Sequence, residues 1–175
     1  MTHGSDKYDF RHAQVSDVER IMEIVRSAQR RLALTGSDQW QNGYPNLTRI
    51  AEDIERGYGR VLCLEGRVVA YGALVYDGER AYDALRGGEW LTGNSHDYLT
   101  VHRLCVAEEV VGSGCGRRFM LTAEREAALR CRSIRVDTHP KNAIMQHLLS
   151  SLHYSYCGTV EYESPRWAYE LLLRK

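Results

Sequence analysis

Three alternating glycines lie in the run Val111-Gly112-Ser113-Gly114-Cys115-Gly116-Arg117, near the middle of the chain. An apolar segment rich in β-branched residues precedes them at 98–106, and an amphipathic segment with apolar residues three and four positions apart follows at 114–131. This order predicts a strand, a glycine loop and a helix. The first turn of a helix presents unpaired N–H groups at the positive end of the helix dipole, and glycines leave those groups accessible. The run therefore predicts a phosphate or pyrophosphate site, with a simple tight turn as the alternative.

The spacing of the glycines distinguishes between classes of phosphate ligand. A P-loop is excluded because no Lys-Ser or Lys-Thr follows the glycines at the required spacing. The dinucleotide pattern Gly-x-Gly-x-x-Gly has Arg117 in place of its third glycine. Asp137, roughly twenty residues further on, has the position of a ribose-binding acid. An NAD(P)-dependent oxidoreductase is therefore one alternative, although too few strand-helix-strand units precede the C-terminal hairpin for a doubly wound fold.

The third class is acyl-CoA. The residues from Val111 to Gly116 resemble the Gln/Arg-x-x-Gly-x-Gly/Ala signature of the GNAT N-acetyltransferase superfamily, with Val111 in place of the leading Gln or Arg. Residues 104–106 are similar to the fourth strand of that family, and residues 137–142 to the end of its fifth strand and the asparagine that follows. Residues 148–154 match its Leu-Tyr-x-x-x-Gly-Phe helix end, with Leu149 at the tyrosine, His153 at the glycine and Tyr154 at the phenylalanine. The resemblance covers about residues 8–175.

The resemblance implies acetyl-CoA as the cofactor and a primary amine of a small molecule or peptide as the acceptor. It implies that the pyrophosphate binds the glycine loop, that the pantetheine arm pairs with the exposed edge of the fourth strand, and that a backbone N–H there polarises the thioester oxygen. The expected cofactor-binding residues are Leu104, Cys105, Val106, Val111, Gly112, Ser113, Gly114, Cys115, Gly116, Arg117 and Asn142.

Acetyl transfer to an alkylamine benefits from a general base, because a free alkylamine with a pKa of about 10 arrives protonated at neutral pH. His102 is the candidate, since it lies two residues before Leu104 and so is expected on the same strand face. The resemblance supports it, because a similarly placed histidine is credited with base work through water in the arylalkylamine branch. The alternatives are that His102 packs in the sheet or binds substrate without proton transfer. The tyrosine that often protonates the leaving thiolate is replaced by Leu149, so the thiolate leaves unassisted or another residue serves. A catalytically weak acyl-CoA-binding module is a further alternative, motivated by Val111 and Leu149.

The resemblance places part of the pocket for the acceptor amine in the loop between the first two helices. Trp40, Gln41 and Tyr44 could line this pocket, or they could pack between the two helices. Arg103, expected on the strand face opposite His102, and Arg166 could bind a carboxylate or simply face water. No histidine spacing indicates a metal site.

The length of 175 residues and the composition are those of an ordinary globular chain. It has 23 basic and 23 acidic side chains, which gives no steering toward nucleic acid or an anionic membrane. Five scattered cysteines favour free thiols in a reducing cytoplasm, and no apolar run approaches membrane length. We expect a polar, disordered tail at residues 1–7 and one domain at residues 8–175, with exposed strand edges that would allow a homodimer.

The hydrophobic periods predict the order β-α-α-β-β-β-α-β-α-β-β, a mixed α/β fold with one parallel crossover in a mostly antiparallel sheet of about seven strands flanked by four helices. This is the order that the GNAT resemblance implies, with a splayed parallel pair at the cofactor site. Ser16 with Glu19 is expected to cap the first helix, and Asn46 and Gly57 to bound the second. Glu65-Gly66 predicts a hairpin turn, and residues 141–152 a helix with an apolar stripe of Ile144, Met145, Leu148, Leu149 and Leu152.

Overall fold

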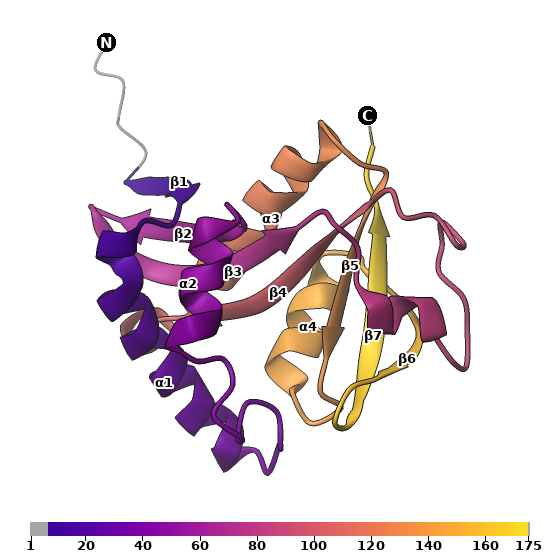
Figure 1. The fold of residues 1–175 in the computed structure, drawn as a ribbon, viewed down its shortest axis with the longest axis horizontal. Helices are drawn as coiled ribbons and strands as arrows, with labels where there is room; N and C mark the ends of the chain where they lie inside the picture. The colour runs from indigo at the N-terminus through magenta and orange to yellow at the C-terminus, as the bar shows by residue number, and fades with distance from the viewer. Residues whose placement is uncertain (1–6, 175) are drawn as a thin grey trace.

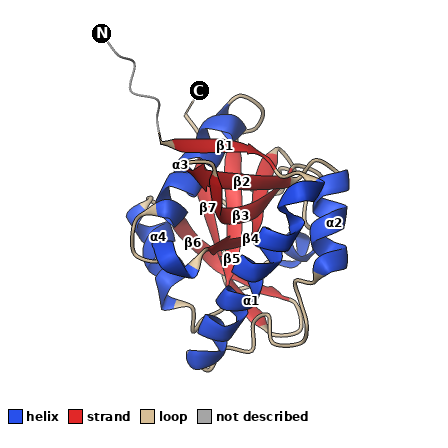
Figure 2. Cartoon of the chain, turned by 90° about the vertical axis from the view of Figure 1, so that its left-hand side faces the viewer, coloured by secondary structure: helices blue, strands red, loops and turns tan. Residues whose placement is uncertain are grey.

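The computed structural model describes residues 7–174 and arranges them as a seven-stranded sheet with two helices on each face (Figure 1; Figure 2). The strands are β1 (Tyr8–His12), β2 (Gly59–Leu64), β3 (Arg67–Val75), β4 (Tyr98–Val106), β5 (Ser133–Thr138), β6 (Ser155–Glu161) and β7 (Pro165–Leu172). The helices are α1 (Val18–Leu34), α2 (Leu47–Glu55), α3 (Cys115–Ala128) and α4 (Ala143–Ser151). Residues 1–6 of the expected tail lie outside the described residues. The carbonyl of Lys7 accepts a hydrogen bond from the N–H of Glu65 at 2.8 Å.

The sheet has the order β1-β2-β3-β4-β5-β7-β6, and its central pair β4–β5 is parallel while all its other neighbouring pairs are antiparallel. The predicted element order and sheet class are therefore confirmed. The β4–β5 ladder is short: it joins Tyr98–Thr100 to Ser133–Arg135 and then stops. Beyond this point the two strands diverge, as Figure 1 shows. The expected splayed pair is present.

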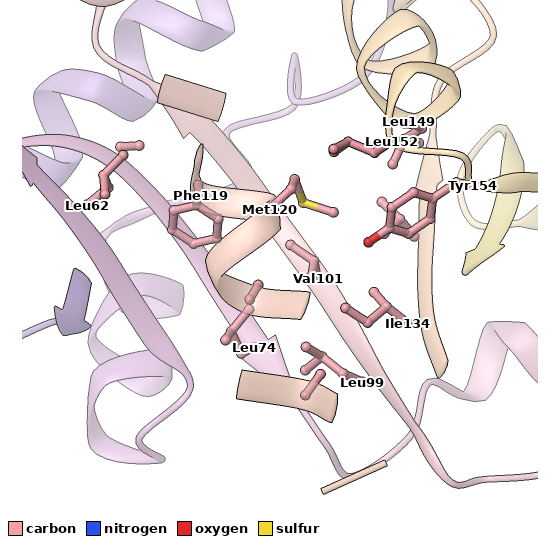
Figure 3. Packing of buried hydrophobic residues seen from close by; sticks show 14 of the residues in the cluster. Leu62, Leu74, Leu99, Val101, Phe119, Met120, Ile134, Leu149, Leu152 and Tyr154 are labelled. Atoms are coloured by element: carbon pink, nitrogen blue, oxygen red, sulfur yellow. The ribbon is translucent and has the colours of Figure 1, made fainter. Parts of the chain in front are cut away.

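Two hydrophobic clusters attach the helices to the sheet. Helices α3 and α4 cover one face, where Phe119 and Met120 of α3 pack among sheet residues such as Leu74, Val101 and Ile134 (Figure 3). Helices α1 and α2 cover the other face, with a cluster that includes Ile21, Ile50 and Tyr71. Figure 2 shows these two helical layers on opposite sides of the strands. The predicted apolar face of α3 is buried throughout, as are all five cysteines, which are free thiols. No helix among residues 7–174 is long and apolar enough to cross a membrane.

Local signals placed several element ends correctly. The side chain of Asn46 accepts a hydrogen bond from the N–H of Arg49 and so caps α2, and Gly57 follows the end of α2 with a left-handed φ of 72°. Glu65 and Gly66, with φ values of 51° and 82°, form the tight turn between β2 and β3.

Two local predictions were wrong. Helix α1 begins at Val18 rather than after Ser16, because Arg11 holds Asp17 at 2.7 Å and 3.0 Å and the Asp17 carboxylate accepts the N–H of Gln14. The tertiary ion pair therefore places the cap one residue later than the capping-box pattern does. On α4, Ile144 is exposed instead of buried, since it lies in the first turn, before the helix reaches the core. The stripe that does pack on the core is Met145, Leu148, Leu149 and Leu152.

Candidate active site

The glycine loop lies between β4 and α3, where the sequence places it. Gly112 and Gly114 have φ values of 79° and 85°, which a side chain rarely adopts. A Cβ added at either position would meet nothing within 4 Å, so the loop is open on its outer side. Gly114 is the N-cap of α3, and the first turn of a helix leaves its N–H groups without acceptors in the helix. The loop therefore offers several N–H groups and the positive end of a helix to one open surface, which suits a pyrophosphate.

Arg117 and Asn142, both expected at the cofactor, have partners on α4. Arg117 donates to the Ser151 hydroxyl at 3.0 Å, which ties the start of α3 to the end of α4. The side-chain oxygen of Asn142 accepts the N–H of Met145 at 3.2 Å and caps α4. Asn142 thus lies beside the end of β5, and its oxygen serves the helix.

The gap between the diverging strands exposes the β5-facing edge of β4 beyond Thr100. Leu104, Cys105 and Val106, the expected pantetheine edge, lie in this part of β4. Arg31 of α1 donates to the Val106 carbonyl at 2.8 Å, so that carbonyl already has one partner. The unpaired edge and the glycine loop are continuous along the chain through the short turn η3 (Glu108–Val110).

A bulge in β4 changes which side chains share a face. Val101 and Leu104 both pack in the cluster under α3 and α4, although they are three residues apart rather than two. The pairing shifts at the same place, and Arg103 has a left-handed φ of 59°. His102 and Leu104 therefore lie on opposite faces, and the expectation that they share a face was wrong. Arg103 was expected opposite His102, but it reaches α2 and lies on the same side of the sheet as His102.

His102 contacts a carboxylate that the sequence did not single out. Its Nε2 lies 3.0 Å from Oε2 of Glu79, and both side chains are mostly buried. Glu79 immediately precedes the turn η2 (Arg80–Ala84), and its Oε1 accepts the N–H of Ala81 at 3.1 Å. Burial alone would raise the pKa of Glu79, but the hydrogen bonds from His102 and Ala81 bring that pKa below its ordinary value. Glu79 is therefore a carboxylate held at both oxygens, with the imidazole on one of them.

Asp137 lies at the end of β5, next to the gap. Its Oδ2 accepts hydrogen bonds from the hydroxyl groups of Tyr82 at 2.7 Å and Tyr162 at 3.3 Å. Burial raises the pKa of the Asp137 carboxyl. The hydroxyl of Tyr162 also bonds Glu79, so this phenol joins the two carboxylates. Polar groups from β4, β5, η2 and the β6–β7 turn thus meet where β4 and β5 separate.

Arg103 is buried, which overturns the surface alternative for this residue. Its guanidinium binds both oxygens of Asp53 on α2 at 2.7 Å and 2.8 Å. Asp53 also accepts the hydroxyl of Tyr71 at 2.6 Å, and Arg103 donates to the hydroxyl of Tyr44 at 2.7 Å. Tyr44 therefore connects the α1–α2 loop to the bulge of β4. The guanidinium is occupied by these partners, so a role for Arg103 with a substrate carboxylate remains only a prediction.

The α1–α2 loop contacts the β6–β7 turn. Asp38 lies 2.8 Å from Nε2 of His139 and accepts the Ser164 hydroxyl at 3.0 Å, while Asn42 donates to Glu163. Arg166 donates to the carbonyl of Ser164 at 3.2 Å and to the Ser164 hydroxyl. These contacts join the α1–α2 loop to the β6–β7 turn.

The other two predicted acceptor residues hold the same loop in place. Gln41 bonds the Gln29 carbonyl of α1 at 2.9 Å, and Trp40 packs on the cluster under α1 and α2. Trp40, Gln41 and Tyr44 therefore brace the loop, and lining the acceptor pocket stays a prediction for them.

Leu149 replaces the family tyrosine and is fully buried in the cluster under α3 and α4 (Figure 3). Replacing Leu149 with tyrosine should overpack this cluster and bury a hydroxyl, at a cost of about 1–3 kcal/mol, without raising kcat. Melting temperature and kcat measured together check this. Leu149→Met, which conserves volume, is the control and should cost less than about 1.5 kcal/mol. A faster tyrosine variant with an unchanged melting temperature would contradict the expectation.

The sequence missed Glu79, Tyr82 and Tyr162 as members of the site. Nothing in their spacing connects them to His102, because they come from an irregular segment and a turn that only the sheet brings together. Asp137 was noticed, but as a ribose-binding acid; its position at the end of β5 was the usable signal.

Comparison with known proteins gives the family. The sequence profile described as Acetyltransferase (GNAT) family matches residues 19–154. A solved acetyltransferase of the GNAT family from Streptococcus agalactiae is 36% identical, with a TM-score of 0.92, over 97% of this chain and 98% of its own. No curated protein sequence matches the chain.

Two more distant structures share the fold. The putative acetyltransferase yncA from Salmonella typhimurium, solved with its cofactor acetyl-CoA, is 17% identical, with a TM-score of 0.66, over 97% of this chain and 96% of its own. A ribosomal-protein-alanine N-acetyltransferase from Brucella melitensis is 20% identical, with a TM-score of 0.67, over 94% of this chain and 99% of its own. The profile match covers most of the chain and the Streptococcus structure nearly all of it, which confirms the predicted family and its cofactor, acetyl-CoA. The chain belongs to the GNAT acetyltransferase family.

Proposed function

We propose that the protein transfers the acetyl group of acetyl-CoA to a primary amine of a small molecule or peptide. The observation that carries this proposal is the placement of His102 and Glu79 at the gap between β4 and β5, on the strand that leads into the glycine loop. An acetyl donor bound along the unpaired edge of β4 would bring its reacting end to that gap. An amine acceptor is also what the name of the Brucella melitensis neighbour gives for that protein.

The residues present fit acetyl-CoA. The open, left-handed glycines and the first turn of α3 supply N–H groups for the pyrophosphate. The edge of β4 around Leu104, Cys105 and Val106 supplies backbone groups for the pantetheine arm. Acetyl-CoA brings the acetyl group as an activated thioester, and the chain's own residues orient it and manage protons.

The acceptor amine arrives as an ammonium ion at neutral pH and must lose a proton before it can act as a nucleophile. His102, partly exposed at the gap, is the residue that takes this proton. The carboxylates of Glu79 and Asp137 make the surroundings favourable for a cationic amine. Leu149 is buried in the core, so the chain offers no hydroxyl at the position of the family tyrosine.

The test is thiol release from acetyl-CoA across a panel of amines, from alkylamines to peptides with free N-termini, with calorimetry for CoA and for NAD(P). Turnover on at least one amine supports the proposal. Tight CoA binding without turnover on any amine would favour the weak acyl-CoA-binding module. The family match does not support the oxidoreductase alternative. That alternative would require the protein to bind NAD(P) rather than CoA.

A cytoplasmic location and a homodimer belong to the same proposal. Five buried free thiols suit a reducing compartment, and β1 is a terminal strand of the sheet, whereas the outer edge of β6 already pairs with Arg86 through Thr159. Fractionation of the source cells and light scattering of the purified protein check the two points.

Gly114→Asp should lower CoA affinity about tenfold or more, which is about 1.4 kcal/mol, because a carboxylate would face the anionic pyrophosphate. The left-handed φ of 85° strains any side chain, but no atom lies within 4 Å of the added Cβ and aspartate is one of the few residues that enter this region, so the fold should survive. Calorimetric titration with CoA measures the effect.

Gly114→Asn is the matched control, since asparagine has the same shape, tolerates the left-handed φ of 85° and carries no charge. It should lose much less affinity than the aspartate variant. Equal affinities for wild type and Gly114→Asp would show that the pyrophosphate binds elsewhere.

A further inference from the structure

Two hydrogen bonds, separate from the contact with His102, hold Glu79 in place. Its backbone N–H donates to the hydroxyl of Tyr98 at 3.0 Å, and its Oε1 accepts the N–H of Ala81 at 3.1 Å. Tyr98 is itself buried on β4, four residues before His102. The remaining oxygen, Oε2, is therefore held at a set place, 3.0 Å from Nε2 of His102.

This contact assigns the two ring nitrogens of His102 different roles. An ionised carboxylate only accepts hydrogen bonds, so Nε2 must carry a proton when the imidazole is neutral. Nδ1 is then the nitrogen with a free lone pair. A base needs such an accessible lone pair, and a second group that holds its tautomer.

We infer that Glu79 is a positioning residue that keeps the proton of His102 on Nε2, so that Nδ1 is the atom that accepts the proton of the acceptor amine. The inference rests on the proposed function. Nδ1 takes one proton from the ammonium ion and gives a neutral amine and an imidazolium that faces the Glu79 carboxylate. The amine nitrogen forms its bond to the acetyl carbon as the C–S bond breaks, its second proton leaves with the thiol, and the imidazolium returns its proton to solvent.

Other titratable groups surround this pair. Asp137 of β5, Tyr82 of η2 and Tyr162 of the β6–β7 turn face the gap, Arg103 is next along β4, and Arg166 of β7 acts on Asp137. Of these groups and Glu79, it is Glu79 that lies within ion-pair distance of the His102 ring. The test therefore replaces Glu79 and measures both the reaction rate and the tautomer of the His102 imidazole.

The first arm is kinetic, on the full chain with the best amine of the panel. Glu79→Gln keeps the shape but loses the charge that stabilises the imidazolium. It should lower kcat by at least about tenfold, and by no more than His102→Gln does. The pH profile of kcat/KM should differ from that of the wild type, and the KM for acetyl-CoA should stay unchanged. In the His102→Gln background, Glu79→Gln should cause little further loss, because the two residues act as a unit.

The matched control is Asp83→Asn. Asp83 lies in the same segment and contacts His96 at 3.7 Å, but both side chains are mostly exposed. This variant should leave kcat and the pH profile as in the wild type. Glu79→Asp, which keeps the charge on a shorter side chain, should recover part of the rate lost in Glu79→Gln.

The second arm needs no turnover. Imidazole ¹⁵N shifts, with His102 assigned by comparison with His102→Gln, should show the Nε2-protonated tautomer in the wild type and a mixture in Glu79→Gln. If the wild type shows this tautomer but turns over no amine, the proposed function is wrong, while the pairing of Glu79 with His102 stands. A wild type that turns over, with an Nδ1-protonated ring or a Glu79→Gln profile identical to its own, would overturn the inference.

Discussion

His102→Gln should lower kcat/KM by about 10²–10⁴-fold, the range that general acid–base catalysis contributes in enzymes. Glutamine fills a similar volume and can still bond Glu79, but it cannot take up a proton at neutral pH. The variant should also lose any inflection that the wild type shows where imidazoles titrate. Steady-state kinetics against pH, at saturating acetyl-CoA, measure both effects.

Two comparisons make this result specific. CoA affinity should be unchanged, because His102 lies on the sheet face opposite the Leu104 side chain and away from the glycine loop. His96→Gln, at an exposed histidine, should have wild-type kinetics. Full activity in His102→Gln would retire the base assignment and leave proton removal to water or to the carboxylates at the gap.

Asp53→Ala should lower the free energy of unfolding by about 3–5 kcal/mol, the usual cost of breaking a buried ion pair from one side. The change leaves the Arg103 guanidinium buried without its carboxylate, and it removes the acceptor of the Tyr71 hydroxyl as well. Domains of this kind are typically stable by only about 5–15 kcal/mol, so the loss is a large share of the total. Urea unfolding, with the midpoint compared at equal slope, measures it.

Glu52→Ala is the matched control on the same helix. Glu52 pairs with Arg49 in the solvent, so its removal should change stability by no more than about 0.5 kcal/mol. The double replacement of Asp53 and Arg103 by leucine should recover only part of the loss, because no charge then remains buried but the Tyr71 hydroxyl still lacks its acceptor and the left-handed backbone at position 103 loses the bonds that hold it. Equal midpoints for wild type and Asp53→Ala would show that the ion pair does not stabilise the fold.

The same ion pair has a consequence for the site. Arg103 holds a left-handed backbone conformation that costs about 1–3 kcal/mol for a residue with a side chain. Its bonds to Asp53 and Tyr44 supply the compensation, and they fix the bulge between His102 and Leu104. The positions of His102 and of Leu104 are thereby tied to helix α2 through Arg103.

Local signals were sufficient for much of this protein. Alternation and helical periods depend on neighbours a few residues apart, so they predicted the strand–glycine loop–helix unit and the order of elements. The caps at Asn46 and Gly57 and the Glu65-Gly66 turn are equally local, and all three are present. His102, the cofactor loop and the family resemblance were available from the same residues.

What the tertiary structure decided depends on contacts between segments far apart in the chain. The Arg103 bulge, which reverses the faces of β4, is held by Asp53 fifty residues away. The start of α1 depends on a contact closer in the chain, from Arg11 to Asp17, which the capping-box pattern does not include. Glu79 meets His102 because Tyr98 and Ala81 hold the segment before η2 against β4. The spacing of such partners along the sequence follows no regular pattern, because a buried charge can be paired with any residue that the fold brings next to it. The amino-acid sequence by itself determined the framework and the glycine loop, and only the folded sheet determined which carboxylate contacts His102, because that contact joins segments with no shared period along the chain.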